Sequence, residues 1–126
     1  MRVLLDTCVI YPSILRSILL GAAKKGLFVP LWSERIIEEW RRAAERNHED
    51  AEATIEIALL RVKWPEAQVE IGPENKDLFL PDENDVHVLQ AAIEGKADEL
   101  LTANLKDFPT DILTGHGIVR RSPDDF

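Results

Sequence analysis

The sequence predicts an α/β sandwich built around a mostly parallel central sheet. Two observations support this fold class. Short apolar runs alternate along the chain with segments whose apolar residues recur at helical spacing. The first run, at residues 2–5, is apolar without alternation, which is typical of a strand covered on both faces. Such sheets bind ligands beyond the carboxyl ends of their strands, so the residues that follow each strand are the first candidates for a site.

In the first part of the chain, a strand is predicted at residues 2–5 and a second at residues 27–32. Between them, Ser13 begins a helix with helically spaced apolar residues, and Gly26 closes it. Ser33 is suited to cap the next helix. The buried stripe of that helix is expected to be Ile36, Ile37, Trp40 and Ala44.

A further helix is predicted over residues 50–62, followed by the least regular part of the chain, residues 63–78. Within it, residues 69–71 are either an edge strand or an extended loop. Pro30 weakens the prediction for the second strand, because proline has no N–H to donate to a neighbouring strand.

Asp85 opens a short apolar helix that ends near Gly95, and a strand follows at residues 100–102. Residues 112–117 are expected to form a turn, and residues 118–121 a last strand. Acidic residues therefore flank this helix–strand unit at both ends, and they share one site only if the helix starts at the carboxyl edge of the sheet.

With 126 residues, the chain is expected to form a single domain, residues 1–126. No apolar run approaches the roughly 20 residues of a membrane-spanning helix, and the chain starts on a strand-like run, so we expect no signal peptide. Cys8 is the only cysteine, which excludes an internal disulfide and favours a reducing compartment, by default the cytoplasm.

The net charge of −8 and the pI near 4.8 argue against a general nucleic-acid binder, because an acidic surface repels phosphates. Two features soften this conclusion. Carboxylates gathered in a metal site add to the negative count, while bound cations would offset them. Basic residues also cluster locally, at Arg35, Arg41, Arg42, Arg46, Arg120 and Arg121.

Five acidic residues stand at positions where a site is expected, and each has an ordinary structural explanation. Asp6 can cap or turn the chain after the first strand, and Glu39 can lie on a solvated helix face. Asp82 fits an N-cap, with Asp85 inside the first helical turn, where negative charge is favoured. Asp107 can end a turn before a Phe-Pro pair. Singly, none of them indicates a function.

Other chemistries have less support. Cys8 lacks an arginine six positions later, where Ile14 stands, so a phosphatase-type loop is not indicated and a small buried residue is expected. His48, His87 and His116 show no zinc spacing, and we expect His87 to be a packing or capping residue. Neither G-x-x-x-x-G-K-[ST] nor G-x-G-x-x-G occurs.

Together, four blocks resemble a known family. In order they are L-L-D-T, E-E-W, D-E-N-D-V-H-V-L-Q-A-A-I and L-L-T-A-N-L-K-D-F, and they span nearly the whole chain. The chain resembles a PIN domain, in particular the bacterial and archaeal PIN-like proteins that include VapC-type toxins. The resemblance implies a three-layer α/β/α sandwich and an Mg²⁺- or Mn²⁺-dependent endoribonuclease, a hydrolase of RNA phosphodiester bonds, as the toxin of a toxin–antitoxin pair.

The resemblance also implies the site residues. Asp6 is the first-strand ligand, Glu39 the helix acid and Asp85 the acid before the A-A helix, with Glu38 as a neighbouring alternative to Glu39. The fourth position is Asn104 or Asp107, because family members place their last acid at either position. Thr7 and Thr102 are expected to orient these groups. Crowded carboxylates repel one another, and hard divalent cations remove that penalty.

The same resemblance implies a cognate antitoxin that inserts a side chain or helix into the acidic groove, and a homodimer. Whether one or two ions act is left open, as is nuclease action on DNA flaps. The alternative function is a catalytically inactive PIN-fold binding or scaffold protein. The first long helix offers apolar surface for both core and interface, through Ile14, Leu15, Ile18 and Leu19.

Overall fold

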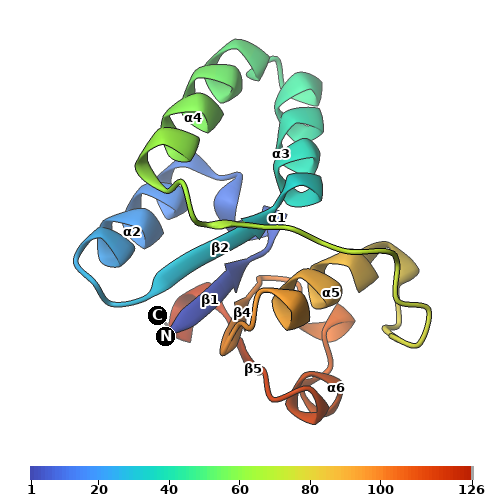
Figure 1. Ribbon diagram of the computed structural model, residues 1–126. Coiled ribbons are helices and arrows are strands. Elements are labelled where there is room, and N and C mark those ends of the chain that lie inside the picture. Colours follow the sequence, from blue (N-terminus) through green and yellow to red (C-terminus); the bar gives the residue numbers. More distant parts are fainter. Residues whose placement is uncertain (126) are drawn as a thin grey trace.

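The computed structural model of the chain (Figure 1) describes residues 1–125 and contains a five-stranded sheet of order β3-β2-β1-β4-β5. Every neighbouring pair of strands is parallel, as the sequence predicts. The strands are β1 (Arg2–Leu5), β2 (Val29–Ser33), β3 (Gln68–Val69), β4 (Glu99–Leu101) and β5 (Val119–Arg121).

The helices cover both faces of this sheet. They are α1 (Thr7–Ile10), α2 (Ser13–Lys24), α3 (Glu34–Arg46), α4 (Asp50–Lys63), α5 (Val86–Glu94) and α6 (Thr110–Gly115). Three short 3₁₀ turns are η1 (Glu83–Asp85), η2 (Leu105–Asp107) and η3 (Pro123–Asp125). Helices α2, α3 and α4 lie on one side of the sheet, and α5 and α6 on the other (Figure 1). This is the predicted three-layer α/β/α sandwich, and right-handed crossovers account for the division of its helices.

The strand order places the site. The chain passes from β1 to β2 on one side and later reaches β4 on the other side of β1, so the order reverses between β1 and β4. In parallel sheets, a crevice opens at such a reversal beyond the carboxyl ends of the strands. Helix α5 connects to β4 and runs back toward the amino edge (Figure 1). The start of α5 and the end of β4 therefore lie at the same edge, which is the condition for a shared site.

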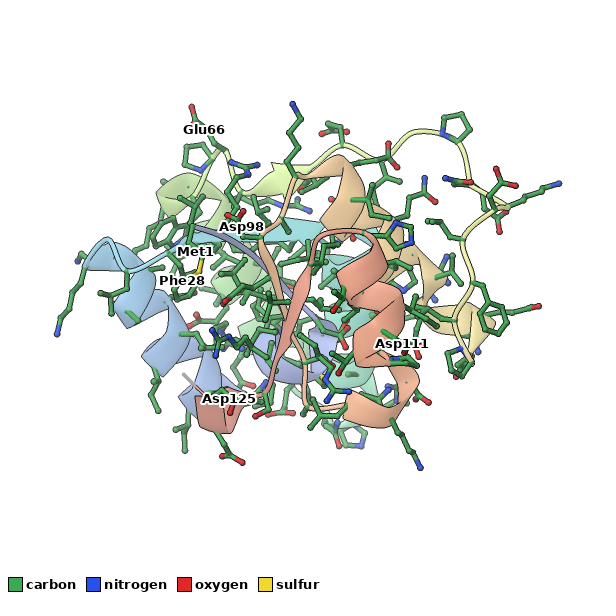
Figure 2. The ribbon with its side chains drawn as sticks, turned by 90° about the horizontal axis from the view of Figure 1, so that it is seen from below. Met1, Phe28, Glu66, Asp98, Asp111 and Asp125 are labelled. Carbon is green, nitrogen blue, oxygen red and sulfur yellow. The ribbon has the colours of Figure 1, made fainter. Side chains whose placement is uncertain are left out.

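The opposite, amino edge of the sheet carries different residues. Figure 2 labels Met1, Phe28, Glu66 and Asp98, each of which directly or closely precedes a strand. The edge is tied together by backbone hydrogen bonds, since the N–H of Val29 donates to the Met1 carbonyl and that of Asp98 to the Arg2 carbonyl, both at 2.7 Å. The predicted site acids lie away from this edge.

The central strands are buried on both faces, which explains their unbroken apolar runs. Val3, Leu4, Leu31, Leu100 and Leu101 are fully buried. Burying such a side chain stabilises the fold by about 1.5–3 kcal/mol. Pro30 lies within β2, opposite Val3, without breaking the pairing. The N–H of Val29 donates to the Met1 carbonyl and that of Trp32 to the Ala67 carbonyl.

Local signals hold at most boundaries. The Ser33 hydroxyl accepts the N–H of Ile36 as predicted for an N-cap. Gly26 ends the α2 turn with φ of +85°, a conformation that L side chains rarely adopt. Gly95 packs so closely that an added Cβ would lie 2.7 Å from the Val69 side chain. Residues 69–71 prove to be an edge strand only at Val69.

Two local predictions were wrong or incomplete. Residues 112–117 do not form a simple turn, because Thr110–Gly115 is helix α6, held by buried Leu113 and packed against β5. The glycines there end the helix rather than replace it, and Gly117 has φ of +75°. The short helix α1, directly after β1, was not predicted; Val9 and Ile10 anchor it in the core.

Candidate active site

Asp6 leaves β1 at the reversal point and is held by its neighbours. Its side chain accepts hydrogen bonds from the Thr7 N–H at 2.8 Å and from the Thr102 hydroxyl at 2.9 Å, and the residue is 7% exposed. Burial raises the pKa of Asp6, the bonds from Thr102 and Thr7 oppose that rise, and the nearby charge of Glu39 adds to it. Thr7 and Thr102 thus orient this carboxylate, as expected for polar residues at strand ends.

Glu39 projects from α3 toward the same edge, and both of its carboxylate oxygens are engaged. Oε1 accepts the Thr7 hydroxyl at 2.7 Å, and Oε2 lies 3.1 Å from Nε2 of His87. Burial alone would raise the pKa of Glu39, but the hydrogen bonds from His87 and Thr7 outweigh it, and the pKa is lowered. Glu38 instead pairs with Arg41 at 3.2 Å on the outer side of the helix.

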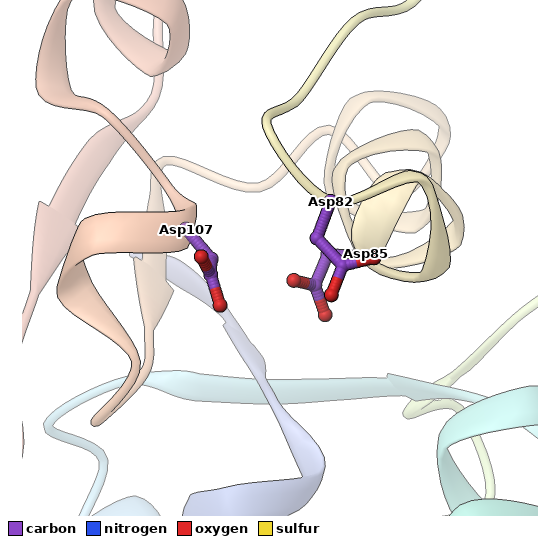
Figure 3. A group of neighbouring side chains, drawn as sticks. All are labelled: Asp82, Asp85 and Asp107. Atoms are coloured by element: carbon purple, nitrogen blue, oxygen red, sulfur yellow. The ribbon is translucent and has the colours of Figure 1, made fainter.

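A group of three aspartates lies beside these residues (Figure 3). Asp82 and Asp85 project from the turn before α5 toward Asp107 in η2, and one oxygen from each lies within 4.8 Å of the others. Asp82 also accepts the Asn84 N–H at 2.9 Å, so it caps the turn and faces the group at once. Asn104 donates its amide N–H to Asp107 Oδ2 at 2.7 Å.

Asp85 is the acid with the least hydrogen bonding in this group. Its Oδ2 is buried and has no hydrogen-bond partner among residues 1–125. Burial, followed by the charges of Asp6, Asp82 and Asp107, raises the pKa of Asp85 to about 6, with His87 opposing. The carboxylate is therefore destabilised where it stands, because an ionised oxygen without a donor or cation nearby is costly to bury.

A pocket of about 460 Å³ joins acids from three separate parts of the chain. Asp6, Glu39 and Asp85 all line it, together with Asn104. Asp107 faces Asp85 from η2 and completes the acidic rim. The structure thus brings Asp6, Glu39, Asp85 and Asn104 to one pocket at the carboxyl edge of β1 and β4, and Asp107 adjoins that pocket through Asp85.

The chemistry of these groups fits a hard divalent cation. All the donors are carboxylate or amide oxygens, which Mg²⁺ and Mn²⁺ prefer. The buried, unpartnered Asp85 Oδ2 and the mutual repulsion of the aspartates are penalties that a cation would remove. Asp82, Asp85 and Asp107 bring one oxygen each within 4.8 Å of one another and could hold such an ion together. Asp6, Glu39 and Asn104 line the pocket with Asp85 and could add oxygen ligands, but they are not part of that close group within residues 1–125.

The surroundings of three residues differ from those expected from the sequence. Asp82 was assigned to capping, although its D-x-x-D spacing from Asp85 could have indicated a paired role. His87, expected to pack or cap, bonds to Glu39 instead, and only the fold brings these two residues together. Cys8 is exposed, not buried, with Sγ 3.4 Å from Asp6 Oδ2; its partial desolvation and the charge of Asp6 raise the pKa of the thiol.

Fold and site together define an α/β/α sandwich protein with an acidic, cation-compatible pocket at the carboxyl edge of a parallel sheet. A profile of the PIN domain family matches residues 2–106. The chain belongs to the PIN domain family. The match ends just before Asp107, so that residue is placed in the site by geometry alone.

Two similar proteins carry related names. A 42-residue stretch is 48% identical to "Putative ribonuclease VapC50" of Mycobacterium tuberculosis (strain ATCC 25618 / H37Rv), covering 33% of this chain and 25% of that protein. The chain thus spans about a quarter of the length of this curated relative. A chain in the crystal structure of VapBC2 from Rickettsia felis, bound to a DNA fragment from their promoter, superposes with a TM-score of 0.62 at 17% identity. That superposition covers 97% of this chain and 98% of the other, and it supports the fold.

Proposed function

We propose that this protein is a divalent-cation-dependent endoribonuclease that hydrolyses RNA phosphodiester bonds, and that it is the toxin of a toxin–antitoxin pair. The observation that carries the proposal is the convergence of Asp6, Glu39 and Asp85 on one pocket, with Asp107 at its rim. Membership of the PIN family and the names of the two similar proteins support the same reaction class and an antitoxin partner.

The acids divide the work according to their surroundings. Asp85 and Asp107, together with Asp82, would hold Mg²⁺ or Mn²⁺, with Asp6 of the same pocket as a further ligand, and Asn104 orients Asp107 through its amide. A bound divalent cation supplies a nucleophile from water at neutral pH and stabilises charge on the phosphate. Glu39 is fixed by Thr7 and His87, and each of its oxygens keeps a second lone pair for the cation or the attacking water.

RNA cleavage by the wild type and matched variants tests the proposal. We expect cleavage with Mn²⁺ that is lost on chelation and reduced at least about 100-fold in Asp6→Asn and Asp85→Asn, the range typical of losing one electrostatic catalytic group. Glu38→Gln is the matched control, since it removes a neighbouring acid that points away from the pocket. Undiminished cleavage in both aspartate variants would refute the assignment.

A catalytically inactive PIN-fold binding protein is the second candidate. Two features favour it. The net charge of −8 weakens the attraction for RNA, and the neutral amide of Asn104 weakens the attraction for a cation. Calorimetry with Mn²⁺ separates the two functions. Binding that is weakened in Asp85→Asn supports the nuclease, and no binding at millimolar metal supports the scaffold.

We propose that the homodimer interface uses exposed apolar residues of α2 and α4, whereas the antitoxin reaches the acidic pocket. Ile14 and Ile18 are 78% and 64% exposed, whereas Leu19 is buried and Leu15 half-buried. Apolar residues of α4 are exposed as well, namely Ile55, Leu59 and Val62. Large apolar side chains exposed in this number are typical of interaction surfaces.

Within residues 1–125, no helix combines the length and apolar character needed to cross a bilayer.

A further inference from the structure

One face of α3 carries both an acid of the site and two cations. Glu39, Arg42, Ala43 and Arg46 are spaced three, four and seven residues apart, which places them on the same side of the helix. All four line the pocket of about 460 Å³ that also contains Asp6 and Asp85. The two arginines are therefore part of the wall of the acidic pocket and extend it along the helix.

Nearby acids neutralise these two arginines less than they neutralise Arg41. Arg42 lies 4.0 Å from Glu38, at the limit of an ion pair, and its side chain is 66% exposed. Arg46 is exposed and forms no ion pair with any acid among residues 1–125. Arg41 differs, because it binds Glu38 at 3.2 Å and Glu34 at 3.5 Å. Arg46 can thus bind an anion without losing an ion pair, and Arg42 would lose only one long, exposed pair, which contributes little.

A second pocket, which adjoins the site at His87, has the reverse charge. Its volume is about 570 Å³. Among its described lining residues, Arg35 is the one Lys or Arg side chain. Its acidic lining residues are Glu34, Glu70, Glu74 and Glu83. A phosphate chain approaching a protein of net charge −8 is repelled there and attracted on the arginine side.

We propose that Arg42 and Arg46 form a phosphate-binding track for single-stranded RNA that leads to the acidic pocket. The inference rests on the proposed function, since it names how that site holds its substrate. Guanidinium groups stay charged and bind phosphate oxygens through paired N–H donors. Their positions, four residues apart on a helix, are separated by about 6 Å, of the order of the spacing of successive phosphates on an extended strand.

The test uses Arg42→Gln, Arg46→Gln and the double variant, with Arg41→Gln as the matched control. Arg41→Gln removes the same charge from the same helix outside the pocket. Binding of a short labelled single-stranded RNA is followed by fluorescence anisotropy in chelator, so that no cleavage occurs. We expect roughly five- to tenfold weaker binding for each pocket variant, and a slope of log K against log salt reduced by about 0.7 per arginine. Arg41→Gln should bind within about twofold of the wild type.

Two results would overturn the track. One is wild-type affinity and salt slope in the double variant. The other is unaltered RNA binding together with lost binding of poly-glutamate, which would assign the arginines to an acidic protein partner. Retained unfolding profiles and Mn²⁺ binding would exclude misfolding as the cause of a positive result.

Cleavage kinetics separate this inference from the proposed function. Loss of the track raises KM and leaves kcat, whereas Asp6→Asn lowers kcat. If the wild type cleaves no RNA but binds it through these arginines, the nuclease proposal fails and the track stands.

Discussion

Asp85→Asn should stabilise the metal-free protein while it weakens cation binding. The substitution removes the carboxylate whose buried oxygen lacks a partner, and it breaks no side-chain hydrogen bond of Asp85 within residues 1–125. Because the pKa of Asp85 is raised in the folded state, its contribution to stability is complete below the unfolded pKa. That contribution is lost as pH rises through about 6. In the variant, this loss is absent.

The magnitude follows from the two pKa values. The difference between about 6 in the fold and the ordinary 3.8 corresponds to about 3 kcal/mol. Asp85 is partly exposed, so solvent screening reduces this figure to about 1–2 kcal/mol. For a chain of this size, we expect a melting temperature about 4–8 °C higher in Asp85→Asn than in the wild type above pH 7 without metal.

The assay is thermal unfolding in chelator at about pH 4 and above pH 7, repeated with Mn²⁺. We expect the two proteins to differ much less at the lower pH, since Asp85 is then protonated in the folded wild type and close to half protonated in the unfolded chain. With Mn²⁺ the wild type should gain stability and the variant should gain less. Glu66→Gln, at the amino edge of the sheet, is the control and should show neither effect (Figure 2). An equal or lower stability of Asp85→Asn above pH 7, or a difference independent of pH, would refute this reasoning.

Three further outcomes are expected. Glu39→Gln should cost about 1–2 kcal/mol of unfolding free energy in urea near pH 7 and less near pH 4. The reason is that a lowered pKa stabilises the fold at pH values above the pKa of the unfolded chain. An equal cost at both pH values would contradict this. His87→Ala should lower both stability and cleavage, because Glu39 Oε2 loses its hydrogen-bond partner. His87→Gln can still donate a hydrogen bond and should recover part of each. Equal losses in the two variants would count against a positioning role for His87. Ile14→Asp and Ile18→Asp should shift light-scattering mass toward monomer with unchanged unfolding, and an unaltered mass would remove α2 from the interface.

Most elements were predictable because their signals are local. The buried runs of β1 and β4, the Ser33 cap and the positive φ of Gly26 each depend on a few neighbouring residues. Helix α6 was missed because its glycines indicate a turn equally well, and packing of Leu113 under β5 decides for a helix. Where a local signal has two outcomes, a contact distant in the chain selects one.

The candidate site was only partly predictable for the same reason. The sequence predicted only an N-cap role for Asp82. The structure confirms that role, and it also places the same carboxylate opposite Asp85 and Asp107. His87 gave no signal, because its partner Glu39 stands 48 residues away. The choice between Glu38 and Glu39 depended on family resemblance, and the fold turns Glu39 into the pocket while Glu38 pairs with arginines.

The sequence by itself determined the alternation of strands and helices, and it placed acids directly after strands and at a helix start. Hydrophobic spacing and capping depend on residues that are close in the sequence, so these features can be predicted without the tertiary structure. The tertiary structure alone decided which acids meet. Parallel pairing sets β4 beside β1, and α5 starts at their carboxyl edge. Asp6 and Asp85 therefore share a pocket and Asp107 lies beside Asp85, although the three are far apart along the chain. Strand order is fixed by burial of the whole sheet, and no short stretch of sequence contains that information.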